Sequence, residues 1–207
     1  MEDYAKLKTQ YIESAAYHEA GHVTAAIIQK MPLQDRGVHI DLKGGGISYY
    51  SHRVPGDLKN TERDREEREV TIVALYAGQV AQQTFFSDCP EECWENDRRE
   101  VGLLLDEMNP HDEESRAAVE AALWSRTTGL VAEYWSLIES LAQTLLAKPT
   151  TPQLPIEIEQ NWSNGQTNLE KWMSGSEIAE FFKGMGISRR AEKSQTQRQP
   201  DRDGLTD

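Results

Sequence analysis

The sequence contains few cysteines, few basic residues and no long hydrophobic run. Its 207 residues include two cysteines, Cys89 and Cys93, so a disulfide-stapled secreted fold is not expected. No apolar stretch approaches the roughly 20 residues that cross a bilayer. The first residues, MEDYAKLKTQYIES, are polar where a signal peptide has its apolar core. We therefore expect a cytoplasmic protein with no membrane contact.

Basic residues are outnumbered by acidic ones. The chain has 22 Lys and Arg against 35 Asp and Glu, which gives a formal net charge of -13. Because binding to phosphates needs clustered Lys and Arg, this balance argues against a nucleic-acid partner. Hydrophobic residues make up 38% and charged residues 28% of the chain, which is typical of a soluble helical protein with polar segments.

The spacing of apolar residues predicts a mostly helical α+β protein with one small sheet. Helices are expected at residues 5–30, 61–86, 97–109, 115–147 and 176–182, the fourth of them kinked or split at Thr127–Gly129. Alternating residues at 36–42 and 47–53 predict two strands, joined through Gly44–Gly46 as a hairpin. Helix starts are indicated at Thr61, at Asn96, and at Ser174, which forms a capping box with Glu177.

The same patterns divide the chain into three parts. Residues 1–147 are expected to form one domain, and residues 148–186 an extended loop with a short helix that packs on it. Residues 187–207 offer almost nothing to bury and are expected to be disordered.

The most informative segment is His18-Glu19-Ala20-Gly21-His22. Histidines four residues apart on a helix lie about 40° apart around its axis, so both imidazoles can bind one zinc ion. Glu19 can then reach a water molecule beside the metal, accept its proton, and pass that proton to a leaving amine. Gly21 leaves room for another backbone to approach. Because the segment lies among Ala, Val and Ile, two surface histidines with a chance polar neighbour are the weaker interpretation.

The motif does not identify the third ligand that a catalytic zinc needs. A third histidine six residues after His22 is ruled out, since Ile28 stands there. About ten carboxylates between Asp57 and Glu100 remain as candidates. Asp97 has one advantage, because a helix N-terminus keeps a carboxylate ionised.

Three segments together resemble a known family. AYHEAGH, VALYAGQVAQQTFF and ENDRREV, in this order, are similar to the peptidase domain of the FtsH-type AAA zinc metalloproteases over about residues 15–147. The resemblance implies a zincin-like FtsH peptidase fold, with one Zn²⁺ per chain held by His18, His22 and Asp97, and with Glu19 as the catalytic base.

The resemblance also implies where a polypeptide substrate binds. The strand that follows the glycines matches the family position for extended substrate, here Gly45, Gly46, Ile47, Ser48 and Tyr49. Main-chain pairing to a strand edge gives affinity with little sequence preference.

The sequence departs from this family in two respects. Only seventeen residues precede His18, and no G-x-x-x-x-G-K-[ST] motif occurs, so we expect no ATPase module and no ATP-driven unfolding by the chain itself. Such a protein either cuts flexible segments unaided or works with a separate unfoldase; monomer, weak oligomer and hexamer all stay open. In addition, Gln82 and Gln83 stand where the family has an acidic pair, which we interpret as altered packing or assembly.

Lesser signals have ordinary interpretations. Cys89 and Cys93 are expected to be reduced thiols, with a redox pair that shifts Asp97 or a rival soft-metal site as the alternatives. His39, His52 and His111 are lone histidines and not expected ligands, although His52 would end the substrate strand.

The main hypothesis is a standalone, ATP-independent zinc endopeptidase that acts on extended or unfolded polypeptides. The alternative is a catalytically idle, zinc-binding adaptor or assembly domain derived from such a peptidase. A hydrolase acting on another class of substrate also stays open, because a zinc site specifies the chemistry better than the substrate.

Overall fold

A computed structural model describes residues 2–50, 61–108, 113–152 and 169–187. In these residues the structure is mostly helical with a small antiparallel sheet, as the sequence predicts at the level of fold class. The elements are α1 (Glu2–Ile28), β1 (Leu33–Asp41), β2 (Gly46–Tyr50), α2 (Glu62–Phe85), the 3₁₀ turn η1 (Glu91–Trp94), α3 (Glu95–Met108), α4 (Glu113–Glu133), α5 (Trp135–Leu146), β3 (Thr151–Pro152), β4 (Leu169–Met173) and α6 (Gly175–Gly184).

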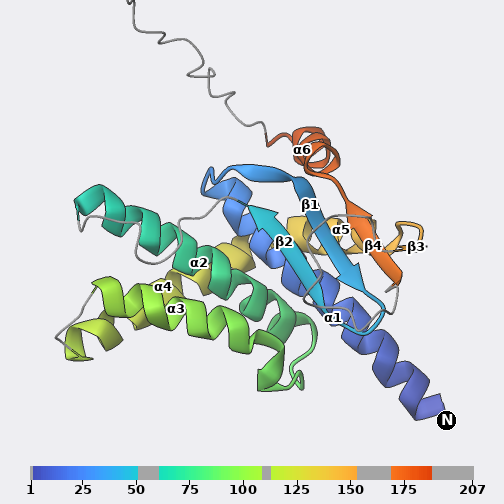
Figure 1. The fold of residues 1–207 in the computed structure, drawn as a ribbon, viewed down its shortest axis with the longest axis horizontal. Coiled ribbons are helices and arrows are strands. Elements are labelled where there is room, and N and C mark those ends of the chain that lie inside the picture. The colour runs from blue at the N-terminus through green and yellow to red at the C-terminus, as the bar shows by residue number, and fades with distance from the viewer. Residues whose placement is uncertain (1, 51–60, 109–112, 153–168, 188–207) are drawn as a thin grey trace, which may run out of the picture.

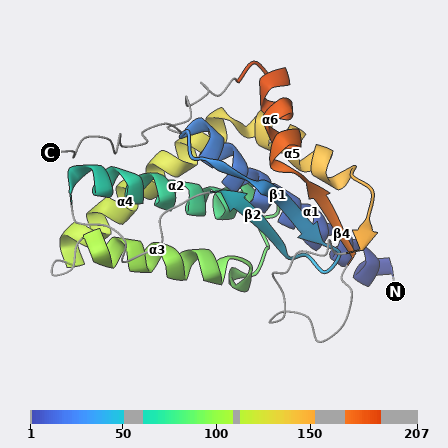
Figure 2. The ribbon, with the colours of Figure 1, turned by 45° about the horizontal axis from the view of Figure 1, so that its top comes forward.

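Helix α1 is the centre of the fold. It contacts α2, α5, β1 and β2, and every residue from Ser14 to Ala26 is buried. Figures 1 and 2 show the sheet lying across α1, while α2, α3 and α4 form a helical layer beside it. One hydrophobic core joins α1 to the sheet, α5 and α6, and a second joins α2 to α3 and α4. The segment His18–His22 therefore lies in the interior of the fold, between the sheet and α2.

The sheet is larger than the expected hairpin. Its strand order is β2-β1-β4-β3, with antiparallel neighbours throughout. Val38 pairs with Ser48 on one side and with Met173 on the other. Strand β4 was not predicted, because LEKWM lacks a clear alternation and its strand forms by pairing with β1. Strand β2 is at the edge of this sheet.

The predicted helix starts have mixed outcomes. Thr61 and Ser174 each cap their helix, which confirms both predicted starts, and Ser174 forms the predicted capping box with Glu177. The prediction for Asn96 was wrong: α3 begins at Glu95 and follows η1 directly. Glu95 already has helical dihedral angles, so no cap is needed at Asn96. Asp97 still lies in the first turn of α3, where the helix dipole stabilises a carboxylate.

The long fourth helix is divided at a different place from the one predicted. It continues through Thr127–Gly129 and ends at Glu133, and Tyr134 leaves the helical conformation before α5. The hydroxyls of Thr127 and Thr128 donate to carbonyls one turn earlier, which lets both residues remain inside a helix. The predicted strand end at 51–53, the extended segment 153–168 and the tail 188–207 lie outside the described residues.

Candidate metal centre

Three side chains meet between α1 and α3. His18 and His22 lie one turn apart on α1, and their Nε2 atoms are 2.9 Å apart. Asp97 Oδ2 lies 3.1 Å from His18 Nε2 and 3.3 Å from His22 Nε2. The structure thus brings together the three residues that the resemblance implied as ligands. This group could hold a metal ion.

The hydrogen-bond partner of His22 Nδ1 determines which ring nitrogen carries the proton. His22 Nδ1 lies 2.8 Å from the carbonyl oxygen of Ala74 on α2. A carbonyl oxygen only accepts, so Nδ1 must donate. In the neutral imidazole, Nε2 is then the unprotonated nitrogen and directs its lone pair toward Asp97.

A chain of hydrogen bonds gives His18 the same orientation. Its Nδ1 lies 2.9 Å from Oε1 of Gln82. The Gln82 amide nitrogen donates to Ser14 Oγ over 3.2 Å, and Ser14 Oγ donates to the carbonyl of Tyr11 over 2.9 Å. Because the Ser14 proton goes to Tyr11, Ser14 accepts from the amide nitrogen, and the amide oxygen must face His18. His18 Nδ1 therefore also donates, which leaves Nε2 with a lone pair.

Two nitrogen lone pairs and one carboxylate oxygen consequently converge. Three acceptors within 3.3 Å of one another repel unless a proton or a cation lies among them. In a tetrahedron with metal–ligand bonds of about 2.0–2.1 Å, ligand atoms are about 3.3 Å apart. The observed separations of 2.9 to 3.3 Å fit a small divalent cation bound by all three atoms.

The electrostatics in the absence of a cation agree with this interpretation. Burial alone would lower the pKa of His22, but the charge of Asp97 and a hydrogen bond to it raise that pKa to about 9. Burial would raise the pKa of Asp97, yet both histidines together hold it well below its usual range. A proton held by the His22–Asp97 pair therefore occupies the position that a cation would take.

Close helix packing holds the histidines in place. A Cβ atom added at Gly78 of α2 would lie 2.4 Å from Cε1 of His22, and one added at Gly21 would lie 2.4 Å from the Ala77 carbonyl oxygen. Both distances are far shorter than a van der Waals contact, so only glycine fits at either position. The expectation that Gly21 lets another backbone approach is confirmed, with α2 as that backbone.

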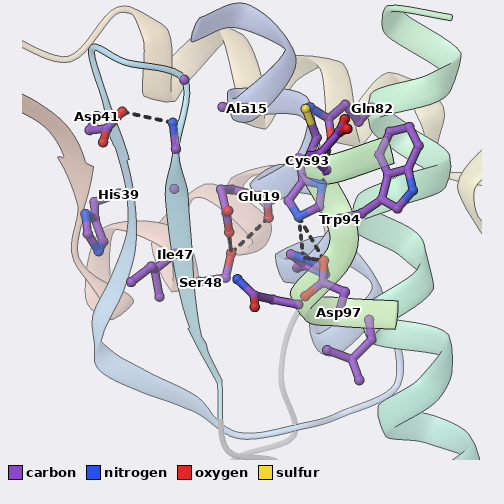
Figure 3. A pocket seen from close by; sticks show the side chains of 18 of the residues that line it. Ala15, Glu19, His39, Asp41, Ile47, Ser48, Gln82, Cys93, Trp94 and Asp97 are labelled. Atoms are coloured by element: carbon purple, nitrogen blue, oxygen red, sulfur yellow. Dashed lines mark hydrogen bonds and ion pairs between the residues drawn. The ribbon is translucent and has the colours of Figure 1, made fainter. Parts of the chain in front are cut away.

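Glu19 lies next to this group with a partner of its own. Its side chain is buried and receives a hydrogen bond from Ser48 Oγ of β2. A Cβ added at Gly46 would lie 2.8 Å from Glu19 Oε1, so the glycine lets the carboxylate rest against the strand. Figure 3 shows Glu19 between β2 and Asp97. Glu19 is thus held beside His18, His22 and Asp97 but is not one of the side chains that could bind the metal ion.

A pocket of about 580 Å³ opens onto these side chains. Gly45, Gly46, Ile47 and Ser48, four of the residues expected to bind substrate, line it. The backbone of Tyr49 belongs to β2, and its side chain lies outside the described part of the chain. Trp94 and Asp97 line the side formed by η1 and α3. The pocket therefore lies between the edge strand and the start of α3.

Gln82 has a role at this site that was not predicted from the sequence. Altered packing or assembly, the interpretation given to Gln82, is incomplete, because its side chain also forms a hydrogen bond to His18. Ala74, Gly78 and Gln82 follow one another at four-residue spacing, the same spacing as His18 and His22. Two matching stripes on two helices are a signal from which the contact could have been predicted.

Other residues at the pocket gave weaker signals. His39 lines the pocket, and its Nδ1 lies 3.1 Å from Oε2 of Glu170 on β4. His52 and His111 lie outside the described residues. Tyr50 is a buried neutral phenol near His22, because burial and then the charges of Asp97, Glu100 and Glu19 raise its pKa.

The two cysteines lie next to each other near α3. Cys89 Sγ and Cys93 Sγ are 3.0 Å apart, and both are free thiols. Burial and the contact with Cys93 raise the pKa of Cys89 to about 12, so this thiol stays protonated at neutral pH. The contact itself is compatible with both the reduced pair and the redox pair considered from the sequence.

Among the described residues, no helix is both long and apolar enough to span a membrane. Comparison with known proteins finds no family model and no curated protein that matches this chain.

Proposed function

We propose that this protein is a zinc-dependent endopeptidase that hydrolyses peptide bonds in extended or unfolded polypeptides and does not itself use ATP. The observation that carries the proposal is the convergence of His18, His22 and Asp97 beside the buried carboxylate of Glu19, in a pocket bordered by an edge strand. The resemblance to the FtsH peptidase domain, with its zincin-like fold, supports the same assignment.

The ligand atoms favour zinc. Two imidazole nitrogens and one carboxylate oxygen are a usual ligand set for catalytic Zn²⁺, which keeps one further position open. A bound zinc ion would supply Lewis-acid polarisation of the scissile carbonyl and make a water molecule more acidic. His18 Nε2, His22 Nε2 and Asp97 Oδ2 would hold it, and Gln82 and the Ala74 carbonyl would keep the two rings oriented.

Glu19 supplies the acid–base function. Its carboxylate is fixed by the hydroxyl of Ser48, and Glu19 directly follows His18 in the sequence. It accepts the proton of the attacking water and donates it to the leaving amine.

The edge strand supplies the substrate contact. Asp41 N–H donates to the carbonyl of Gly45, so the alternation of an antiparallel pair directs the main-chain groups of Gly46 and Ser48 away from β1. An extended peptide pairing with these groups would lie between β2 and α3, above the metal ligands.

The alternative is a catalytically idle zinc domain that serves as an adaptor. A structural zinc site has four protein ligands, whereas only three metal-ligating side chains gather at this group among the described residues. The count favours the catalytic interpretation.

The test uses Glu19→Gln, with Glu13→Gln on the same helix as the matched control. Both variants remove one carboxylate, and Glu13 does not line the pocket. We expect Glu19→Gln to bind zinc normally while its ATP-free cleavage of casein falls by about 10²–10⁴-fold, the usual contribution of general acid–base catalysis. Glu13→Gln should cleave like the unmodified protein. Equal cleavage by both variants would remove Glu19 from the mechanism, and zinc-loaded protein that cleaves nothing would favour the adaptor.

A further inference from the structure

The pocket is lined by acidic residues from several elements. Six acidic residues line it, and none of the described lining residues is Lys or Arg. The acidic residues are Glu19, Asp41, Glu92, Asp97, Glu100 and Glu170. Glu19 and Asp97 belong to the site already described, and Glu170 lies beside His39. Asp41, at the end of β1, has a different setting.

Only one oxygen of the Asp41 carboxylate is used by the turn that joins β1 to β2. Oδ1 accepts from the backbone N–H groups of Lys43 and Gly45 over 2.8 and 2.9 Å. Oδ2 faces the bare Cα of Gly45, where an added Cβ would lie 3.3 Å from it. The carboxylate is thus held in place while its second oxygen borders the strand.

Two neighbouring glycines at the start of β2 each lie against a carboxylate, and the two carboxylates are on opposite faces of the sheet. Gly46 lies against Glu19, and Gly45 lies against Asp41. Ile40 points into the core, so Asp41, the next residue, points to the other face of the sheet. Figure 3 shows Asp41 and Glu19 on the two sides of β2. A peptide paired with β2 would place one side chain beside Glu19 and the adjacent one on the face of Asp41.

The distances suit a long basic side chain. Directly opposite Cβ positions on paired strands are about 5 Å apart, and the Cβ position of Gly45 is 3.3 Å from Asp41 Oδ2. A peptide Cβ opposite Gly45 therefore lies about 8 Å from the carboxylate. The four bonds from Cβ to the lysine ammonium, followed by a charge-assisted hydrogen bond of about 2.8 Å, span this gap across the side-chain-free surface of Gly45.

We propose that Asp41 is a specificity-determining residue, which binds a Lys or Arg side chain of the substrate across Gly45, one residue from the position beside Glu19. This inference rests on the proposed substrate strand. It adds a subsite for one basic side chain to a surface that otherwise recognises only the peptide main chain.

The experiment measures peptide binding apart from cleavage. Fluorescein-labelled peptides of identical neutral sequence carry Lys, norleucine or Glu at each internal position in turn. Their affinities for zinc-loaded Glu19→Gln protein are measured by fluorescence anisotropy. We expect Lys to bind about tenfold more tightly than norleucine at one position only, in line with a hydrogen bond between charged groups. Glu at that position should bind more weakly than norleucine.

Two further variants, each made in the Glu19→Gln protein, assign the effect to Asp41. Asp41→Asn keeps an oxygen for the turn but removes the charge, and it should abolish the preference for Lys over norleucine. Asp35→Asn removes the same charge from the other end of β1, outside the pocket, and should retain the preference.

Three results would overturn the inference: equal binding of the Lys and norleucine peptides, including binding of neither; a Lys advantage at every position, which would indicate general charge attraction; or an unchanged preference in Asp41→Asn. If the Lys preference were present but the unsubstituted protein did not cleave these peptides, the proposed endopeptidase activity would be contradicted. The binding of a basic side chain by Asp41 would still be supported.

Discussion

The two walls of the pocket are built differently. On the wall formed by α1 and α2, the Nδ1 atom of each histidine has a hydrogen-bond partner. Gly21 and Gly78 lie where the helices pack so closely that a Cβ atom would not fit. On the wall formed by β2, Gly45 and Gly46 carry no side chain, a carboxylate lies against each of them, and Ile47 is 37% exposed. In the first wall glycine allows two helices to pack closely, and in the second it allows two carboxylates to lie beside a strand edge. The fixed wall suits the chemistry, and the open wall suits the substrate.

The strongest test of this difference adds one methyl group to each wall. Gly78→Ala would place a Cβ 2.4 Å from the His22 ring, so we expect loss of zinc binding and a decrease of about 1–3 kcal/mol in the free energy of unfolding, as in other overpacked cores. Gly45→Ala on the open wall should leave zinc affinity unchanged. Zinc titration calorimetry and urea denaturation provide both measurements.

Gly129→Ala is the matched control within a helix. Gly129 lies in α4 and has no atom within 4 Å of the position that a Cβ would take. This substitution should raise the free energy of unfolding by up to about 1 kcal/mol, the difference between Ala and Gly in a helix. If Gly78→Ala were stabilising to the same extent, the α1–α2 contact would not be as tight as described.

The sequence alone predicted the part of the site that lies on α1. His18, Glu19 and His22 follow from a local spacing within one helix, and local spacing can be read directly. Asp97 could not be selected from its neighbours alone and came from the resemblance. Its distance from the histidines depends on how α2, η1 and α3 pack, which no short pattern encodes.

Two of the missed features, β4 and the role of Gln82, depend on contacts between distant segments. Strand β4 lies far along the chain from β1, and the Gln82 amide reaches His18 only because two helices meet at Gly21 and Gly78. Asn96 failed as a cap because η1 already had the chain in a helical conformation. The errors at β4 and Gln82 concerned contacts between distant segments, whereas Asn96 was a local error; the capping box at Ser174 with Glu177, which is also local, was predicted correctly.

The next test removes a hydrogen bond from the fixed wall. Gln82→Leu deletes the partner of His18 Nδ1 at similar volume, and we expect zinc affinity to fall about 10–100-fold, the usual cost of losing the group that orients a metal-bound histidine. Gln83→Leu is the control on the neighbouring residue, outside the pocket lining. Competition with a fluorescent zinc chelator measures both affinities. Equal affinities in the two variants would mean that Gln82 does not orient His18.

A smaller effect concerns pH and the metal-free protein. The pKa of His22 is raised to about 9, so its pairing with Asp97 stabilises the fold fully below the ordinary value of about 6.5 and loses that contribution as pH rises through 9. We expect the Tm of chelator-treated protein to fall by a few °C between pH 6.5 and 9.5. Zinc-loaded protein should not show this decline, and neither should chelator-treated His22→Asn. A chelator-treated protein whose Tm stays constant over this range would contradict the coupling of His22 to Asp97.

The most direct test of the account is an anomalous difference map at the zinc absorption edge, from crystals of zinc-loaded protein. We expect one peak, about 2.0–2.2 Å from His18 Nε2, His22 Nε2 and an Asp97 carboxylate oxygen, with no fourth protein ligand. The absence of a peak at these residues, or a peak that includes a fourth side chain from the protein, would contradict a catalytic metal centre at this site.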